Sequence, residues 1–144
     1  MIWTILANKI TFCHMGDKRL LVMIDDDTDD HQILSMALEE LNQPMNYLFF
    51  SDCESAVAHF QKESATPPGY VFLDLNLPRI NGDQCLEKLL QLKEFDDPCI
   101  VIYSTSIPDY WHAKLEKIGV DKFIEKTGSI SELITKIQPL FQPG

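Results

Sequence analysis

Two acidic positions directly follow short apolar runs, and acids placed in this way can do chemistry. Asp74 follows the run Tyr70–Leu73, and an acid triplet at residues 25–27 follows the run Leu20–Ile24. Two or three carboxylates, with carbonyl oxygens and water, form the oxygen site that suits Mg²⁺. A carboxylate beside the metal can attack phosphorus and form an aspartyl phosphate. We therefore expect phosphoryl chemistry at Asp74, assisted by Mg²⁺.

A hydroxyl and a lysine occupy comparable positions later in the chain. The apolar run Cys99–Tyr103 is followed by Ser104 and Thr105, and Lys126 comes shortly after a weaker run at 123–124. A hydroxyl and an ammonium can bind phosphoryl oxygens, so that catalysis consists mostly of positioning and charge neutralisation. Ser104 is the preferred hydroxyl, and Thr105 is the alternative.

Strand-like and helix-like segments alternate along the chain and would position these groups. We expect five strands, at residues 20–24, 47–50, 70–73, 99–103 and 123–124. Apolar residues at helical spacing predict a helix after each strand, ending near Leu41, Gln61, Lys93, Ile118 and Pro139. In the first helix, His31 is expected to be exposed, with an approach to the acids as the alternative.

Such an alternation implies a doubly wound α/β domain. Parallel strands are joined by right-handed crossovers, and helices cover both faces of the sheet. The carboxyl ends of parallel strands share one edge, where open α/β sheets bind ligands. The acids, the hydroxyl and the lysine should therefore meet at that edge.

Composition indicates one acidic domain. The chain has 144 residues, with 22 acids against 12 bases and a net charge of −10. That balance argues against direct binding to nucleic acid or to anionic lipid, both of which need a basic patch. No apolar stretch approaches the roughly 20 residues that span a membrane.

The cysteines give no sign of pairing or of metal binding. They are widely spaced, lack a CxxC pair and do not stand near histidines at metal-ligand spacing: Cys13, Cys53, Cys85 and Cys99. We expect reduced thiols, as in a cytoplasm, and neither a zinc site nor a disulfide framework.

The beginning of the chain differs from the rest. We assign residues 1–17 to an N-terminal extension and residues 18–144 to the domain proper, because Met15 stands just before the first strand. The apolar stretch near the start lacks a charged region before it and a cleavage site, which argues against a signal peptide. The extension is interpreted as non-native sequence or a flexible arm, and an added edge strand is the alternative.

Taken together and in order, these motifs resemble the receiver domain of response regulators in two-component signalling. The resemblance covers about residues 18–141 and rests on an acidic pair, a strand-end acid with its loop, a hydroxyl and a lysine: Asp25 and Asp26, Asp74 with Asn76, Leu77, Pro78, Asn81 and Gly82, Ser104, and Lys126. It implies a flavodoxin-like sheet with strand order 2-1-3-4-5.

The resemblance also implies a metal set. Asp74 corresponds to the phosphoacceptor and is itself a ligand of Mg²⁺. Asp26 corresponds to the direct metal ligand of the acidic pair, whereas Asp25 acts largely through water. Asn76 corresponds to the residue whose backbone carbonyl binds the metal.

Other positions match residues that sense or tune phosphorylation in the family. Ser104 would contact the phosphoryl group, and Lys126 would neutralise it. Phe123 stands where the family has a switch aromatic, which turns inward when the hydroxyl residue moves toward the phosphate. Asn76 and Ser106 stand where side chains tune the rate of self-dephosphorylation.

By this resemblance the chain is a stand-alone, cytoplasmic response regulator and not an enzyme in the ordinary sense. It would take a phosphoryl group from a histidine kinase or a histidine phosphotransfer protein, assist its own phosphorylation and slowly dephosphorylate itself. Phosphorylation would switch a surface of the fourth and fifth helices and the fifth strand that binds a downstream protein. Because about three residues follow the last helix, no output domain is expected; a homodimer stays open.

Two alternatives belong to other classes. One is a receiver-like module that binds partners without phosphorylation, against which the complete set of acids, hydroxyl and lysine argues. The other is a phosphatase resembling the haloacid dehalogenases, which would need a second acid two residues after the nucleophile, where this chain has Asn76.

The chain departs from the family pattern after the lysine. The family usually has a proline there, often in a cis peptide, whereas this chain has Thr127. A cis bond before a residue other than proline costs ~2.5–4 kcal/mol. We therefore predict a trans Lys126–Thr127 bond.

Overall fold

The protein is described by a computed structural model that covers residues 19–141. Its five strands are β1 (Leu20–Ile24), β2 (Asn46–Phe50), β3 (Tyr70–Leu73), β4 (Cys99–Ser104) and β5 (Lys122–Glu125). All neighbouring strands are parallel, and their order is β2-β1-β3-β4-β5. The expected fold class and strand order are confirmed. The predicted extension over residues 1–17 lies outside the described residues.

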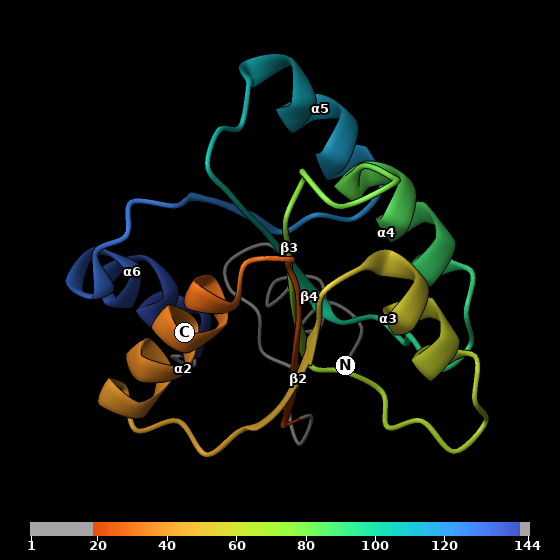
Figure 1. The fold of residues 1–144 in the computed structure, drawn as a ribbon, viewed down its shortest axis with the longest axis horizontal. Helices are drawn as coiled ribbons and strands as arrows, with labels where there is room; N and C mark the ends of the chain where they lie inside the picture. Colours follow the sequence, from red (N-terminus) through yellow and green to blue (C-terminus); the bar gives the residue numbers. More distant parts are fainter. Residues whose placement is uncertain (1–18, 142–144) are drawn as a thin grey trace, which may run out of the picture.

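Helices cover both faces of the sheet (Figure 1). They are α2 (Thr28–Glu40), α3 (Cys53–Phe60), α4 (Gly82–Leu90), α5 (Asp109–Lys117) and α6 (Ile130–Ile137), followed by a 3₁₀ turn, η1 (Gln138–Phe141). Helices α2 and α6 pack on one face, and α3, α4 and α5 pack on the other. Within residues 19–141, no helix is both long enough and apolar enough to cross a bilayer.

The strands supply two separate cores because successive side chains point to opposite faces. In β1, Val22 and Ile24 face the core under α3, α4 and α5, whereas Leu21 and Met23 face the core under α2 and α6. Strands buried on both faces read as continuous apolar runs. That is why β1, β3 and β4 could be located accurately from the sequence.

Local capping explains where the helices begin. The Asp27 carboxylate accepts a hydrogen bond from the N–H of Asp29 at 2.9 Å, and the Asp52 carboxylate accepts one from the N–H of Ser55 at 2.8 Å. Each satisfies an N–H that has no partner inside its helix. Helix α4 ends at Leu90, earlier than the predicted Lys93, because the chain turns there instead of continuing the helix.

The expectation of reduced thiols is wrong, because the described residues contain no free cysteine. Cys53 and Cys85 form a disulfide, with their Cα atoms 5.7 Å apart. Cys53 begins α3 and Cys85 lies in α4, and both are buried where these two helices pack together. Spacing along the chain could not show this pair, because the two helices become neighbours only through the crossover between them.

Candidate phosphorylation site

Backbone hydrogen bonds continue past the strand ends and bring the predicted residues together. The N–H of Asp74 donates to the carbonyl of Ile24 at 3.0 Å, and the N–H of Asp25 donates to the carbonyl of Phe50 at 2.9 Å. The N–H of Lys126 donates to the carbonyl of Ser104 at 2.9 Å. Each residue that follows a strand is therefore held by the neighbouring strand. The acids and the lysine therefore lie together at the carboxyl edge of the sheet, as expected.

Asp74 lies at the centre of this edge and is 6% exposed. Its Oδ1 accepts hydrogen bonds from the hydroxyl of Ser104 at 2.8 Å and from the backbone N–H of Asn76 at 3.0 Å. Its Oδ2 accepts from the ammonium of Lys126 at 2.9 Å. The predicted phosphoacceptor, hydroxyl and lysine are thus in direct contact, although they are 30 and 52 residues apart along the chain.

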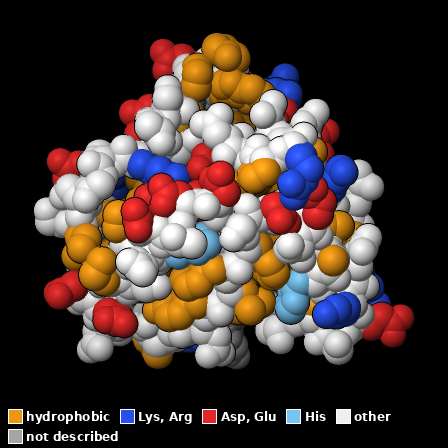
Figure 2. Space-filling view, in the orientation of Figure 1, with side chains coloured by type: hydrophobic (Ala, Val, Ile, Leu, Met, Phe, Trp, Pro, Cys, Tyr) orange, Lys and Arg blue, Asp and Glu red, His pale blue; other side chains and the backbone are white. Residues whose placement is uncertain are grey.

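Three carboxylates could hold a cation together. Asp25, Asp26 and Asp74 each offer an oxygen, and these oxygens lie within 4.8 Å of one another. Asp25 is fully buried, whereas Asp26 is exposed and can reach solvent. In the view of Figure 2, acidic side chains gather near the middle of the molecule, beside a basic side chain.

Asp25 has an oxygen that needs a further partner. Its Oδ2 is buried and lies 2.7 Å from Lys126 Nζ, but without the angles of a hydrogen bond. Burial raises the pKa of Asp25 to about 6, although attraction to Lys126 and to the N–H of Asp27 opposes the rise. A buried carboxylate oxygen without a hydrogen bond is costly. The residues present therefore fit a divalent cation with oxygen ligands.

Lys126 is surrounded by carboxylates and is 11% exposed. Its Nζ lies 2.7 Å from Asp25, 2.7 Å from Asp30 and 2.9 Å from Asp74. Burial alone would lower the pKa of Lys126, but these carboxylates raise it by more, so the pKa lies above its ordinary value. The ammonium is a fixed positive charge at the site.

The loop after β3 is shaped by close backbone contacts. The N–H of Gly82 donates to the carbonyl of Leu75 at 2.9 Å, and Asn76 and Asn81 form an isolated antiparallel bridge. A Cβ at Gly82 would lie 2.9 Å from the Cα of Leu75 and would overlap the carbonyl oxygen of Asp74. Only glycine allows α4 to start this close to Asp74.

The predicted switch aromatic is half-buried and faces a histidine. The Phe123 ring stacks on the ring of His112 in α5, with centroids 4.2 Å apart. Nearby, the Glu125 carboxylate accepts a hydrogen bond from the N–H of Ile107 at 3.1 Å. The loop after Ser104 is therefore tied to the end of β5. The switch role of Phe123 stays a prediction.

The peptide bond after the lysine agrees with its prediction. Residues 19–141 contain no cis peptide bond, so Lys126–Thr127 is trans.

The structure brings two further residues of α2 to the site, one without a predicted role and one for which an approach to the acids was the alternative. Asp30, which the sequence pattern assigns no role at the site, pairs with Lys126. His31 was expected to be exposed, but it is buried, with 9% of its surface accessible. Its Nε2 lies 2.7 Å from the carbonyl oxygen of Asp25. Since a carbonyl only accepts, Nε2 must carry the proton there. The available signal was the helical phase, which turns residues 30 and 31 toward the buried strand ends.

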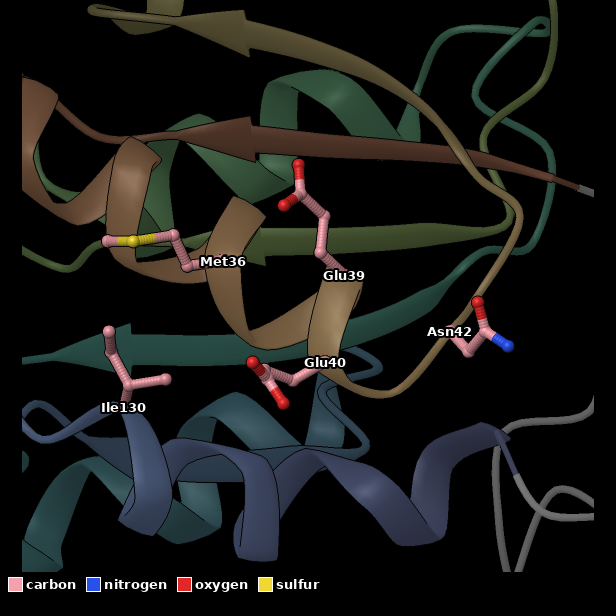
Figure 3. A pocket seen from close by; sticks show the side chains of 5 residues that line it. All are labelled: Met36, Glu39, Glu40, Asn42 and Ile130. Carbon is pink, nitrogen blue, oxygen red and sulfur yellow. The ribbon is translucent and has the colours of Figure 1, made fainter.

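A separate hollow lies between α2 and α6 (Figure 3). It is lined by Met36, Glu39, Glu40, Asn42 and Ile130. Its two carboxylates do not suit an anionic ligand, and it contains none of the predicted site residues. The candidate chemistry therefore stays at the strand ends.

Comparison with known proteins agrees with this geometry. The family model for the response regulator receiver domain matches residues 21–138. A curated relative is the hybrid signal transduction histidine kinase D of Dictyostelium discoideum, 22% identical over 86% of this chain. The match covers 8% of the length of that relative.

Several solved structures have the same fold. The phosphorylated cyanobacterial phytochrome response regulator RcpA is 24% identical, covers 82% of this chain and 87% of its own, and gives a TM-score of 0.70. The Mn²⁺-bound form of response regulator Rcp1 is 20% identical, covers 83% of this chain and 89% of its own, and gives a TM-score of 0.72. A response regulator in red light signalling of R. palustris is 22% identical, covers 85% of this chain and 90% of its own, and also gives a TM-score of 0.72.

The fold and the strand-end site define a signalling domain of the two-component class. Since the family model spans most of the chain, the protein belongs to the response regulator receiver domain family. Receiver domains are signalling phosphoacceptors rather than classical enzymes, and histidine kinases or phosphotransfer proteins phosphorylate them. Family membership favours this class over the haloacid dehalogenase alternative.

Proposed function

We propose that Asp74 accepts a phosphoryl group from a phosphohistidine of a histidine kinase or a histidine phosphotransfer protein. The observation that carries this proposal is the convergence on one carboxylate. Asp74 receives the Ser104 hydroxyl and the Lys126 ammonium, and it lies within 4.8 Å of the carboxylate oxygens of Asp25 and Asp26. Such an arrangement neutralises charge around a transferred phosphoryl group.

In the transfer, an Asp74 carboxylate oxygen attacks phosphorus. The bond between phosphorus and the donor imidazole nitrogen breaks, and its electron pair stays on that nitrogen. Ser104 and Lys126 then donate to phosphoryl oxygens instead of to the free carboxylate. Asp25, Asp26, Asp74 and the backbone carbonyl of Asn76 would hold Mg²⁺, which when bound neutralises charge on the phosphoryl oxygens.

The same contacts support a switch. Ser104 must follow the phosphoryl group, and the loop after it is tied to β5 through the contact between Ile107 and Glu125. A shift of this loop would change the packing of Phe123 on His112 and the surface of α5, β5 and α6. A two-state surface of this kind would bind a downstream protein, or a second copy of the chain as a homodimer.

Hydrolysis of the adduct would be slow and adjustable. Asn76, whose N–H donates to Asp74, and Ser106, two residues after Ser104, are both exposed, so their side chains are accessible to water. We propose that they set the rate of self-dephosphorylation. The proposed compartment is the cytoplasm, where such phosphotransfer partners would meet the domain. In a reducing cytoplasm the Cys53–Cys85 disulfide would be open or transient.

Phosphorylation can be tested with a small donor. The purified protein is incubated with acetyl phosphate and Mg²⁺, and its intact mass is measured, with Asp74→Asn as the control. One labile phosphoryl adduct in the wild type and none in the variant is the expected result. If the wild type acquires no adduct, the proposal is overturned in favour of a phosphorylation-independent binding module.

A further inference from the structure

One carboxylate at the site belongs neither to the proposed metal set nor to the phosphoacceptor. Asp30, in the first turn of α2, is 9% exposed, and its Oδ2 lies 2.7 Å from Lys126 Nζ. We propose that Asp30 is a positioning residue that holds the Lys126 ammonium over the phosphorylation pocket before and after transfer. This inference rests on the proposed phosphorylation of Asp74.

The other two partners of Lys126 change during the proposed reaction. Asp74 Oδ2, 2.9 Å from Nζ in the resting protein, becomes part of the acyl phosphate. Asp25, 2.7 Å from Nζ, also lies in the group of oxygens that can hold the cation. Of these three carboxylates, Asp30 alone keeps both its charge and its partner throughout.

The helix gives Asp30 a fixed place from which to act. The Asp27 cap starts α2, and Leu34 and Leu38 anchor the helix in the core. His31 adds a second anchor, because its Nε2–H donates to the carbonyl of Asp25 at 2.7 Å and its ring stacks on Phe49. A side chain on a helix held in this way is more precise than one on a loop.

Positioning and charge have opposite effects and can be separated. A negative charge at Asp30 repels an anionic phosphoryl donor, so removing it should help the donor to bind. Removing the carboxylate also frees the long Lys126 side chain. The entropy cost of ordering that side chain then adds to the activation barrier. Loss of positioning should therefore lower the maximal rate constant, whereas the half-saturating donor concentration should not rise.

The matched pair of variants is Asp30→Asn and Asp29→Asn. Both remove one negative charge from the first turn of α2, but Asp29 is exposed. Phosphorylation is followed by intact mass over a range of acetyl phosphate concentrations with saturating Mg²⁺. We expect Asp30→Asn to lower the maximal rate constant on the order of tenfold, as loss of a supporting partner does at related sites. Asp29→Asn should match the wild type, and Asp30→Glu should restore part of the rate.

A second measurement observes Lys126 directly in the unphosphorylated protein. A held ammonium exchanges its protons slowly, so its ¹H–¹⁵N signal should be visible in the wild type and in Asp29→Asn and be lost in Asp30→Asn. An unchanged maximal rate constant in folded Asp30→Asn, or a retained ammonium signal, overturns the inference. If the wild type takes up no phosphoryl group, the proposed function fails, and the ammonium signal still decides whether Asp30 holds Lys126.

Discussion

Lys126 is the residue on which the balance of charge at the site depends. Its ammonium is the shared partner of Asp25, Asp30 and Asp74, all of which are largely removed from water. Removing one member of a buried ionic cluster leaves the others uncompensated, and that loss costs more than the intact cluster contributes. A structural effect and a functional effect of Lys126 must therefore be measured separately.

The structural effect should appear in Lys126→Ala. We expect the free energy of unfolding at pH 7 to fall by about 3 kcal/mol, because buried carboxylates lose their counter-charge. Urea denaturation measures this loss, and Lys117→Ala, at an exposed position in α5, is the control. Equal stability of the two variants would contradict the prediction.

Asp25 should make both stability and metal binding depend on pH. Its pKa in the folded protein is about 6, against an ordinary 3.8, so the folded state binds this proton more tightly than the unfolded chain does. In metal-free protein, the stabilisation from this group is complete below the ordinary pKa and is lost as the pH rises through about 6.

Magnesium must displace the same proton. We expect the affinity for Mg²⁺ to fall by up to about tenfold per pH unit below pH 6, because the ligand must be deprotonated. Calorimetric titration at pH 5 and pH 7.5 measures the difference, and Asp25→Asn should bind weakly at both. A dissociation constant that is the same at both pH values would count against this interpretation.

At the scale of the element, the turn from β3 into α4 has the least room for change. Gly82 lies against the backbone of Asp74 and Leu75. Backbone atoms cannot move aside as a flexible side chain can, so an added methyl group must displace the loop that follows Asp74.

The variant Gly82→Ala tests this close approach. We expect a loss of stability of about 1–3 kcal/mol from overpacking, together with slower phosphorylation by acetyl phosphate. Thermal unfolding and intact mass measure the two effects, with Lys88→Ala on the exposed side of the same helix as the control. Unchanged behaviour of Gly82→Ala would show that the loop has more freedom than the contacts imply.

The link between α3 and α4 predicts a response to reducing agents. The Cys53–Cys85 disulfide closes a loop over a separation of 32 residues, and such a loop stabilises a fold by about 4 kcal/mol in the chain-entropy account. Dithiothreitol should lower the midpoint of urea unfolding in the wild type. A double variant, Cys53→Ala with Cys85→Ala, should respond less than the wild type, because only the disulfide of Cys99 then remains to be reduced. If it responds as strongly as the wild type, the Cys53–Cys85 link is not the source of the stabilisation.

At the scale of the whole molecule, the sheet divides the fold into a fixed edge and a movable surface. Phosphorylation should change amide hydrogen exchange in the loop at residues 105–108 and in β5, because Ser104 and the contact between Ile107 and Glu125 connect them to Asp74. Exchange in α3 should stay the same. Mass spectrometry with and without acetyl phosphate measures both, and a uniform change over all helices would contradict a local switch.

Sequence patterns were sufficient for the sheet and for the residues at its edge. Runs such as Leu20–Ile24 and Cys99–Tyr103 are apolar on both faces, and each is followed by a functional side chain. Asp30 and the Cys53–Cys85 pair could not be found in the same way. Their contacts depend on how a helix is rotated and on which helices become neighbours, and neither property is a short-range pattern.

The backbone hydrogen bonds that reach Asp25, Asp74 and Lys126 come from neighbouring strands and not from the outer helices. The proposed phosphorylation site is therefore held by the sheet, while exposed positions on α5 such as Tyr110 take no part in holding it. Substitutions there can alter which protein is recognised without disturbing the chemistry. Partner choice and phosphoryl acceptance can diverge independently during evolution.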